Sequence, residues 1–256
     1  MQAVAEDYIR IERLSKTFGD VVALRDIDIS IEQGSFVSIV GPSGCGKSTL
    51  LRIVAGLLGY EEGSVALDGQ AIRGTRRDVG VVFQSSILLP WRTILENVML
   101  PAEVLDLDRK KARDRAMQLL HMVRLDGFEE KLPRQLSGGM QQRASIARAL
   151  LHDPKILLMD EPFGALDALT RERMNLELQR IWAESGKTVV LITHSIPEAI
   201  FLGDTVLVMT PRPGSIERVL RVDLPRPRTM HAMATPEFGR IADEIRELFS
   251  HTGSFD

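Results

Sequence analysis

The chain has 256 residues, 44% of them hydrophobic, and a formal net charge of −3 at pH 7. This composition is typical of a protein with a full hydrophobic core, and the negative charge argues against a bulk positive field that would attract nucleic acid. A single cysteine excludes an intrachain disulfide, and no window approaches the roughly 18 apolar residues that a membrane span needs.

The N-terminal third of the chain predicts two kinds of strand. Residues 8–35 are expected to form antiparallel strands, because Ile27, Ile29 and Ile31 alternate with polar residues, as in a half-buried strand. Residues 36–40 are continuously apolar apart from one serine, which indicates a buried strand. Residues 1–7 lack the basic start and the apolar run of a signal peptide.

A glycine-rich loop follows the buried strand and precedes an apolar helical stretch. It matches G-x-x-x-x-G-K-[S/T], the loop that wraps nucleotide phosphates, and consists of Gly41, Pro42, Ser43, Gly44, Cys45, Gly46, Lys47, Ser48 and Thr49. We expect Lys47 to reach the β- and γ-phosphates and the Ser48 hydroxyl to hold Mg²⁺. The alternative is a turn that only joins the strand to the helix without binding a ligand, but such a turn does not need Lys47 and Ser48 at their two positions. The helix N-terminus and Lys47 should also favour the thiolate of Cys45.

The middle of the chain predicts a helical insert at about residues 93–150. Thr93 and Glu96 form a capping box that opens a helix, and apolar residues recur at helical spacing beyond residue 110. The basic run 109–115 is interpreted as a solvated helix face rather than a nucleic-acid patch, because acidic residues flank it.

The last 100 residues alternate strands with helices. Strands are expected at 155–159, 188–193 and 205–210, with a helix at 169–185 ending at Gly186. This alternation predicts a mostly parallel sheet covered on both faces. Residues 224–228 predict an irregular linker, followed by a helix from Pro236 whose apolar stripe packs on the body; a membrane-surface helix is disfavoured because its other face is acidic.

Two further motifs carry chemistry. Asp160 and Glu161 end the apolar strand, and adjacent strand residues point in different directions. Asp160 should therefore serve the Mg²⁺ shell through water, and Glu161 should face the attacking water as a general base. The loop of Ser137, Gly138 and Gly139 precedes another helix and offers a second N-terminus suited to an anion. Since one nucleotide does not need two such loops from one small domain, the second is expected to face the nucleotide of another subunit.

The order of these motifs resembles that of the ATP-binding-cassette (ABC) transporter ATPases, over nearly the whole chain from Ile9 to about Val222. The resemblance implies a phosphate-loop NTPase core with a mostly parallel sheet, an antiparallel β subdomain and an inserted helical subdomain. It also implies a head-to-tail homodimer that holds each ATP between the phosphate loop of one chain and the Ser137 loop of the other.

The resemblance assigns roles to further residues. Phe18 would stack on adenine, although an aromatic residue there could equally belong to the core. Gln84 would contact Mg²⁺ and the attacking water, and His194 would reach the γ-phosphate. Asp167 would bridge the two subunits. The domains implied are an ATP-binding domain at 1–222 and a short linker and helix at 223–256.

The segment after Gln84 is similar to the branch of importers that serves nitrate, sulfonates and taurine. In that branch Trp91 would line the groove for a short cytoplasmic helix of the membrane subunit; a plain core tryptophan is the alternative. The implied partners are a transmembrane permease and an extracytoplasmic solute-binding protein, without nucleic acid, and the implied location is the cytoplasmic face of the inner membrane. A soluble cassette ATPase without a transport function is the competing interpretation.

Overall fold

The computed structural model describes residues 7–164 and 166–251, which form two compact units. The first unit comprises the chain up to Arg76 together with the chain from Asn175 onward, and the second comprises Arg77–Met174. The expectation about a signal peptide falls almost entirely on residues outside the described ranges.

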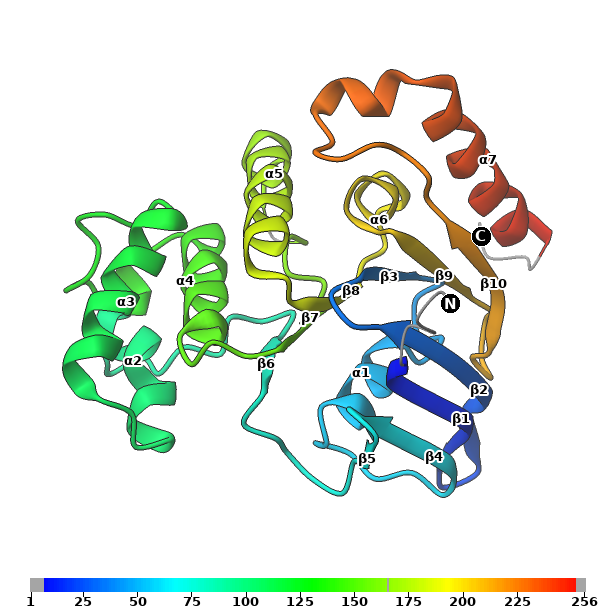
Figure 1. Ribbon diagram of the computed structural model, residues 1–256, viewed down its shortest axis with the longest axis horizontal. Coiled ribbons are helices and arrows are strands. Elements are labelled where there is room, and N and C mark those ends of the chain that lie inside the picture. Colours follow the sequence, from blue (N-terminus) through cyan, green and yellow to red (C-terminus); the bar gives the residue numbers. More distant parts are fainter. Residues whose placement is uncertain (1–6, 165, 252–256) are drawn as a thin grey trace, which may run out of the picture. The chain divides into compact units, whose positions relative to one another are not determined.

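An antiparallel sheet occupies the N-terminal part of the first unit, as the alternating pattern predicts (Figure 1). Its order is β2-β1-β4-β5, from β1 (Asp7–Phe18), β2 (Val21–Glu32), β4 (Glu62–Leu67) and β5 (Gln70–Ala71). Ile27, Ile29 and Ile31 are all buried, while the residues between them are exposed. Burial on alternate positions confirms the half-buried strand.

A second group of strands in the same unit is mainly parallel. Its order is β10-β9-β3-β8, from β3 (Phe36–Val40), β8 (Thr188–Ile192), β9 (Thr205–Met209) and β10 (Ile216–Arg221). The strand β3 pairs in parallel with both β8 and β9, whereas β10 pairs antiparallel with β9. Every residue of β3 and β8 is buried, as expected for parallel strands. The helices of this unit include α1 (Lys47–Val54) and α6 (Ile196–Leu202).

The C-terminal segment is attached to this unit more firmly than an irregular linker would be. Residues 222–229 form neither helix nor strand, yet Arg228 is only 2% exposed. Its Nη1 donates hydrogen bonds to the carbonyls of Ile200 (2.8 Å), Phe201 (3.1 Å) and Gly203 (2.7 Å) at the end of α6. Burial and the neighbouring Arg226 lower the pKa of Arg228 to about 10, which leaves the guanidinium charged at neutral pH.

Beyond this segment come η2 (Met230–Ala234) and α7 (Pro236–His251). Thr235 accepts a hydrogen bond from the Phe238 amide (3.4 Å), as an N-cap before a first-turn proline should. Phe238, Ile241 and Ile245 are buried, and α7 packs against α6 (Figure 1). The prediction that this helix packs back on the body is confirmed.

The second unit combines a pair of parallel strands with a cluster of helices. The strands are β6 (Val79–Val82) and β7 (Ile156–Asp160), and the helices are α2 (Ile94–Val104), α3 (Arg109–Met122), η1 (Pro133–Gln135), α4 (Gly138–Leu150) and the start of α5 (Ala168–Ser185). The helices α2, α3 and α4 pack on one another (Figure 1).

Two local predictions for this unit are confirmed. Thr93 accepts from the Glu96 amide (3.2 Å) while the Glu96 carboxylate accepts from the Thr93 amide (2.7 Å), so the capping box is complete. The basic run at the start of α3 is mostly exposed, as a solvated face should be. No helix within the described ranges is long and apolar enough to span a membrane.

Candidate nucleotide-binding site

The glycine-rich loop joins β3 to α1 and depends on two left-handed glycines. Gly44 has φ of 74° and Gly46 has φ of 104°, a region that residues with a Cβ avoid. A Cβ on Gly46 would also lie 2.6 Å from Leu24 Cδ2. The Nζ of the buried Lys47 donates to the carbonyls of Gly41 (2.8 Å) and Pro42 (2.9 Å). The lysine is thus held inside the curve of its own loop.

Cys45 corrects an expectation. The sequence favoured a thiolate, because a helix N-terminus and Lys47 both stabilise negative charge. In the structure the side chain is only 1% exposed, and burial raises the pKa of the Cys45 thiol, outweighing the opposing effect of Lys47. The thiol is therefore protonated at neutral pH. Desolvation prevails here because the Sγ faces inward, 2.9 Å from the position that a Cβ on Gly41 would take.

A second loop, residues 210–215, supports the glycine-rich loop, and sequence reasoning missed it. The Arg212 guanidinium donates twice to the Gly44 carbonyl, from Nε (3.2 Å) and from Nη2 (2.9 Å). Gly214 approaches so closely that an added Cβ would lie 1.9 Å from the Cys45 carbonyl oxygen. The run of arginine, proline and glycine at 212–214 was the only available signal, and it indicates a turn without naming what the turn touches.

His194 lies at the same sheet edge as the glycine-rich loop. The loop follows β3 and His194 follows β8, its parallel neighbour, and the Thr193 amide donates to the Ile39 carbonyl (3.2 Å). The His194 side chain is exposed. The structure therefore brings these two predicted elements to one edge, where the carboxyl ends of parallel strands bind ligands.

Phe18 is a surface residue and not a core residue, because its side chain is 48% exposed. Phe18 ends β1 and pairs with Val21. Val21 is two residues before Ala23, which with Leu24 lies close to Gly46 of the glycine-rich loop. The ammonium of Lys16 lies 5.0 Å from the centroid of the Phe18 ring. The structure is therefore inconsistent with the interpretation that Phe18 belongs to the core.

In the second unit, the carboxylates at the end of β7 meet the predicted glutamine. The Nε2 of Gln84 donates to the Glu161 Oε2 at 3.0 Å, although the two residues are 77 positions apart. Glu161 also has a φ of 46°, a left-handed conformation that a non-glycine residue adopts at a cost and that often marks a functional position. Asp160, in contrast, is buried in the strand end.

The Ser137 loop opens α4 and presents its first residues to solvent. The Ser137 hydroxyl accepts from the Met140 amide (3.3 Å), and both Ser137 and Gly138 are exposed. A Cβ on Gly139 would lie 2.7 Å from Leu166, so the loop lies directly against the residue before Asp167. Hydrogen bonds from Thr170 hold the pKa of the exposed Asp167 carboxyl below its usual range, which keeps it charged.

The predicted residues are therefore divided between the two units. The first unit holds residues 41–49, Phe18 and His194; the second holds Gln84, the Ser137 loop, Asp160, Glu161 and Asp167. The groups predicted to surround Mg²⁺ are the Ser48 hydroxyl, the Asp160 carboxylate and the Gln84 amide, all of which supply oxygen. A hard oxygen set of this kind fits Mg²⁺.

Comparisons with known proteins identify the family. Residues 24–164 match the family model described as ABC transporter. The chain is 43% identical over 239 residues to an aliphatic sulfonates import ATP-binding protein of Bacillus cereus, covering 93% of both chains. It is 47% identical over 239 residues to a taurine import ATP-binding protein of Rhizobium johnstonii, covering 91% of this chain and 90% of the relative.

Solved structures give the same result. A dimeric ATP-binding cassette in a post-hydrolysis state, bound to ADP and Pi, matches 85% of this chain and all of its own, with a TM-score of 0.77 and 36% identity. The chain belongs to the ABC transporter family and is one of its ATP-hydrolysing cassettes. The predicted fold class, with an antiparallel sheet, a mainly parallel sheet and helices, is confirmed.

Proposed function

We propose that this chain is the ATP-hydrolysing subunit of a membrane importer for a small solute such as nitrate, a sulfonate or taurine. The observation that carries this proposal is the likeness to sulfonate and taurine import subunits through more than nine-tenths of the chain. Such extended likeness includes the surfaces outside the nucleotide motifs, where a subunit of another system would be free to differ.

The site residues then divide the chemistry of hydrolysis among themselves. The loop 41–49 and Lys47 bind the phosphates, and Phe18 supports the adenine ring. Ser48, Asp160 and Gln84 would hold Mg²⁺, which when bound offsets charge on the β- and γ-phosphates.

Glu161 then accepts the proton of the attacking water. Gln84 orients the Glu161 carboxylate through its 3.0 Å hydrogen bond. His194 completes the contact to the γ-phosphate from the sheet edge that the glycine-rich loop shares.

The active form in this proposal is a head-to-tail homodimer. Each chain carries one phosphate loop and one exposed Ser137 loop, whose glycines and helix N-terminus suit a phosphate. Asp167, charged and exposed beside that loop, would reach across to the partner subunit. The dimeric arrangement of a related cassette with ADP and Pi supports this assembly.

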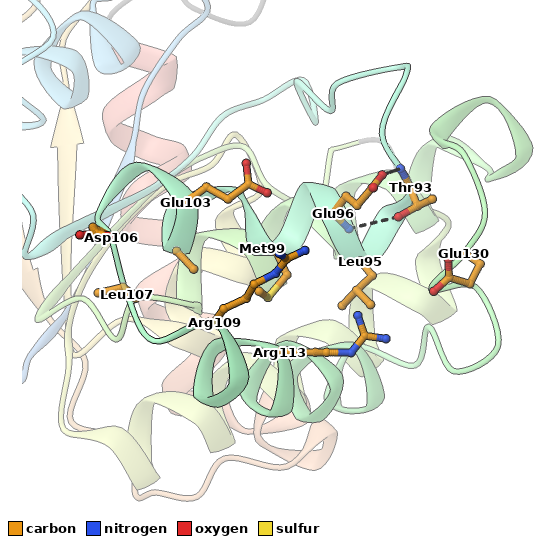
Figure 2. A pocket seen from close by; sticks show the side chains of 11 residues that line it. Thr93, Leu95, Glu96, Met99, Glu103, Asp106, Leu107, Arg109, Arg113 and Glu130 are labelled. Atoms are coloured by element: carbon orange, nitrogen blue, oxygen red, sulfur yellow. Dashed lines mark hydrogen bonds between the residues drawn. The ribbon is translucent and has the colours of Figure 1, made fainter.

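The transmembrane permease docks on the second unit. Trp91 is 72% exposed and Ile87 is also exposed, which excludes a plain core tryptophan. In the same unit, residues of α2 and α3 line an open hollow of about 430 Å³ (Figure 2). Leu95 and Met99 supply apolar surface there, and Figure 2 shows the side chains of Arg109 and Arg113 reaching over it from α3. The lining also carries Glu96, Glu103, Asp106 and Glu130, so a segment with both charged and apolar side chains fits it.

The proposed assembly follows from these surfaces. The residues at about 93–150 act as the permease-facing helical subdomain within an ATP-binding domain at 1–222, and 223–256 is a C-terminal linker and helix. The chain associates with the cytoplasmic face of the inner membrane only through the permease, and an extracytoplasmic solute-binding protein delivers the cargo.

The test is co-purification from membranes, followed by uptake measurements. Tagged chain should bring down a polytopic membrane protein, and a strain that lacks the chain should lose uptake of taurine, an alkanesulfonate or nitrate. Trp91→Ala should lose the membrane partner, while Leu57→Ala, at an exposed apolar residue of the other unit, should keep it. Recovery of nucleic acid in place of a membrane protein would instead support a cassette ATPase without a transport function.

A further inference from the structure

Side chains of helix α4 donate hydrogen bonds to backbone carbonyls on both sides of Gln84. The Gln142 Nε2 donates to the Phe83 carbonyl at 2.9 Å, immediately before Gln84. From the other end of the helix, Arg148 donates to the Ser86 carbonyl (Nη2, 2.9 Å) and to the Ile87 carbonyl (Nη1, 2.7 Å). The glutamine that contacts Glu161 therefore sits between two points fixed by one helix.

A third side chain of α4 connects the same segment to the start of the Ser137 loop. The Gln141 Oε1 accepts from the Ser86 hydroxyl at 3.3 Å. Its Nε2 donates to the Leu136 carbonyl (3.2 Å) and to the Pro133 carbonyl (3.0 Å). One amide thus joins the residue before Ser137 to the segment after Gln84.

These contacts lie where they are costly to lose. Gln142 is only 3% exposed, and burial lowers the pKa of Arg148. The contacts to the Phe83 and Ser86 carbonyls are partly buried, and the contact to the Ile87 carbonyl is exposed. A partly buried carbonyl that loses its donor is unfavourable, and a charged donor makes the stronger bond. We therefore expect the segment 83–87 to move together with α4.

We propose that Gln141, Gln142 and Arg148 form a bracket that makes the segment 83–87 and the Ser137 loop move together. This inference rests on the proposed function, since its consequence concerns hydrolysis. A displacement at Ile87 and Trp91, where the permease docks, then reaches Gln84 and Ser137 at once. The three are positioning residues, because their side chains bind the segment 83–87 and the start of the Ser137 loop and so act through Gln84 and through the N-terminus of α4.

The decisive comparison is Arg148→Gln against Arg143→Gln. Both arginines lie on α4, and both donate to two backbone carbonyls; Arg143 binds those of Val123 (2.9 Å) and Arg124 (3.1 Å), at the end of α3. Each variant loses the same charge and the same kind of contact from one helix, but only Arg148→Gln releases the segment after Gln84.

Two measurements on the full-length chain decide the proposal. In Arg148→Gln, kcat for ATP should fall at least about tenfold with KM within about twofold, because misplaced catalytic groups cost rate and the phosphate loop is untouched. Arg143→Gln should change kcat by less than about threefold, and Arg148→Lys should recover part of the loss. Without nucleotide, deuterium uptake should rise over residues 83–91 and 137–140 in Arg148→Gln only.

Equal losses of kcat in the two variants, or equal uptake over 83–91, would reduce the bracket to ordinary packing and overturn the proposal. If Arg148→Gln does not fold, Gln142→Met carries the same two expectations through the Phe83 carbonyl. The exchange measurement needs no turnover. A parent chain that hydrolyses no ATP would therefore count against the proposed function and leave the bracket to be judged on exchange alone.

Discussion

The amide of Gln84 donates a 3.0 Å hydrogen bond to the carboxylate of Glu161. Neither residue is buried, so the pair can open and accept a water molecule between its members without breaking a packed core. The contact orients the Glu161 carboxylate through its Oε2. This arrangement suits a base whose carboxylate must be held in a fixed orientation.

Glu161→Gln should abolish turnover while it preserves binding. The variant side chain has the same shape, and its amide oxygen can still accept from Gln84, so only the proton acceptor is lost. We expect kcat to fall about 10²–10⁴-fold, with ATP affinity retained and an ATP-bound dimer visible by size-exclusion chromatography. Glu172→Gln, an exposed position on α5 with the same change of charge, is the control. Parent-like hydrolysis by Glu161→Gln would remove Glu161 from the role of base.

Lys47→Ala should weaken nucleotide binding itself. In the proposed function the ammonium would donate charge-assisted hydrogen bonds to phosphate, and in the structure it donates to the Gly41 and Pro42 carbonyls of its loop. Loss of a charged donor corresponds to a rise in the ATP dissociation constant of about tenfold to a hundredfold. Titration with a fluorescent ATP analogue measures it, and Lys110→Ala on the exposed face of α3 should bind as the parent does. Tight binding by Lys47→Ala would show that another group holds the phosphates.

The elements predicted best from sequence are those whose signal is local. The alternating isoleucines of β2, the Thr93–Glu96 capping box and the glycine-rich loop are each defined by residues within a few positions of one another, and each is found as expected. The resemblance added Gln84, and its contact with Glu161 places two motif residues side by side.

The features that sequence could not supply depend on long-range contacts or on burial. Arg212 reaches Gly44 across 168 positions, and Arg228 reaches the end of α6 from a segment read as a linker. No periodicity encodes either contact. The prediction of a Cys45 thiolate was wrong for a related reason. A motif shows the nearby charge and the helix end, but not the desolvation that outweighs them and raises the pKa. The short strands β5 and β10 also went unpredicted.

Cys45 should react slowly with thiol reagents, and its pH dependence has a definite sign. Because burial raises its folded pKa, the folded chain retains the thiol proton at pH values where the unfolded chain, with an ordinary pKa of about 8.5, has lost it. At neutral pH the thiol is protonated in both states, so it does not change the stability. As the pH rises from the ordinary pKa toward the folded pKa, the buried thiol progressively lowers the free energy of unfolding.

Two measurements check this behaviour. Alkylation at pH 7 should be much slower in the native chain than in urea, with a further slowing by ATP, and complete modification should block hydrolysis. Cys45→Ser should be silent to the reagent and should show a shallower loss of stability between about pH 8 and pH 10. Fast labelling at pH 7, or full ATPase activity after complete modification, would contradict the structure.

Arg228→Met should destabilise the first unit. The change leaves the carbonyls of Ile200, Phe201 and Gly203 without the guanidinium that now binds them. We expect a loss of about 3 kcal/mol, of the size found when buried polar groups lose their partner, and a fall in Tm of about 6–12 °C. Arg221→Met, an exposed position on β10, should change Tm by less than about 2 °C. Equal Tm values for the two variants would mean that the Arg228 contacts contribute nothing to stability.

Arg212→Gln should affect nucleotide binding from outside the motif. The guanidinium fixes the Gly44 carbonyl through two hydrogen bonds. It therefore also sets the direction of the Cys45 N–H, which belongs to the same planar peptide unit. A bond of this kind contributes about 0.5–1.5 kcal/mol, which corresponds to a rise of about twofold to tenfold in the ATP dissociation constant. The value of kcat at saturating ATP should stay close to that of the parent, because Glu161 and Gln84 are unaltered. Arg218→Gln, exposed on β10, supplies the matched loss of charge and should bind ATP normally. A fall in kcat with unchanged affinity would place the effect of Arg212 on the chemical step and not on the shape of the loop.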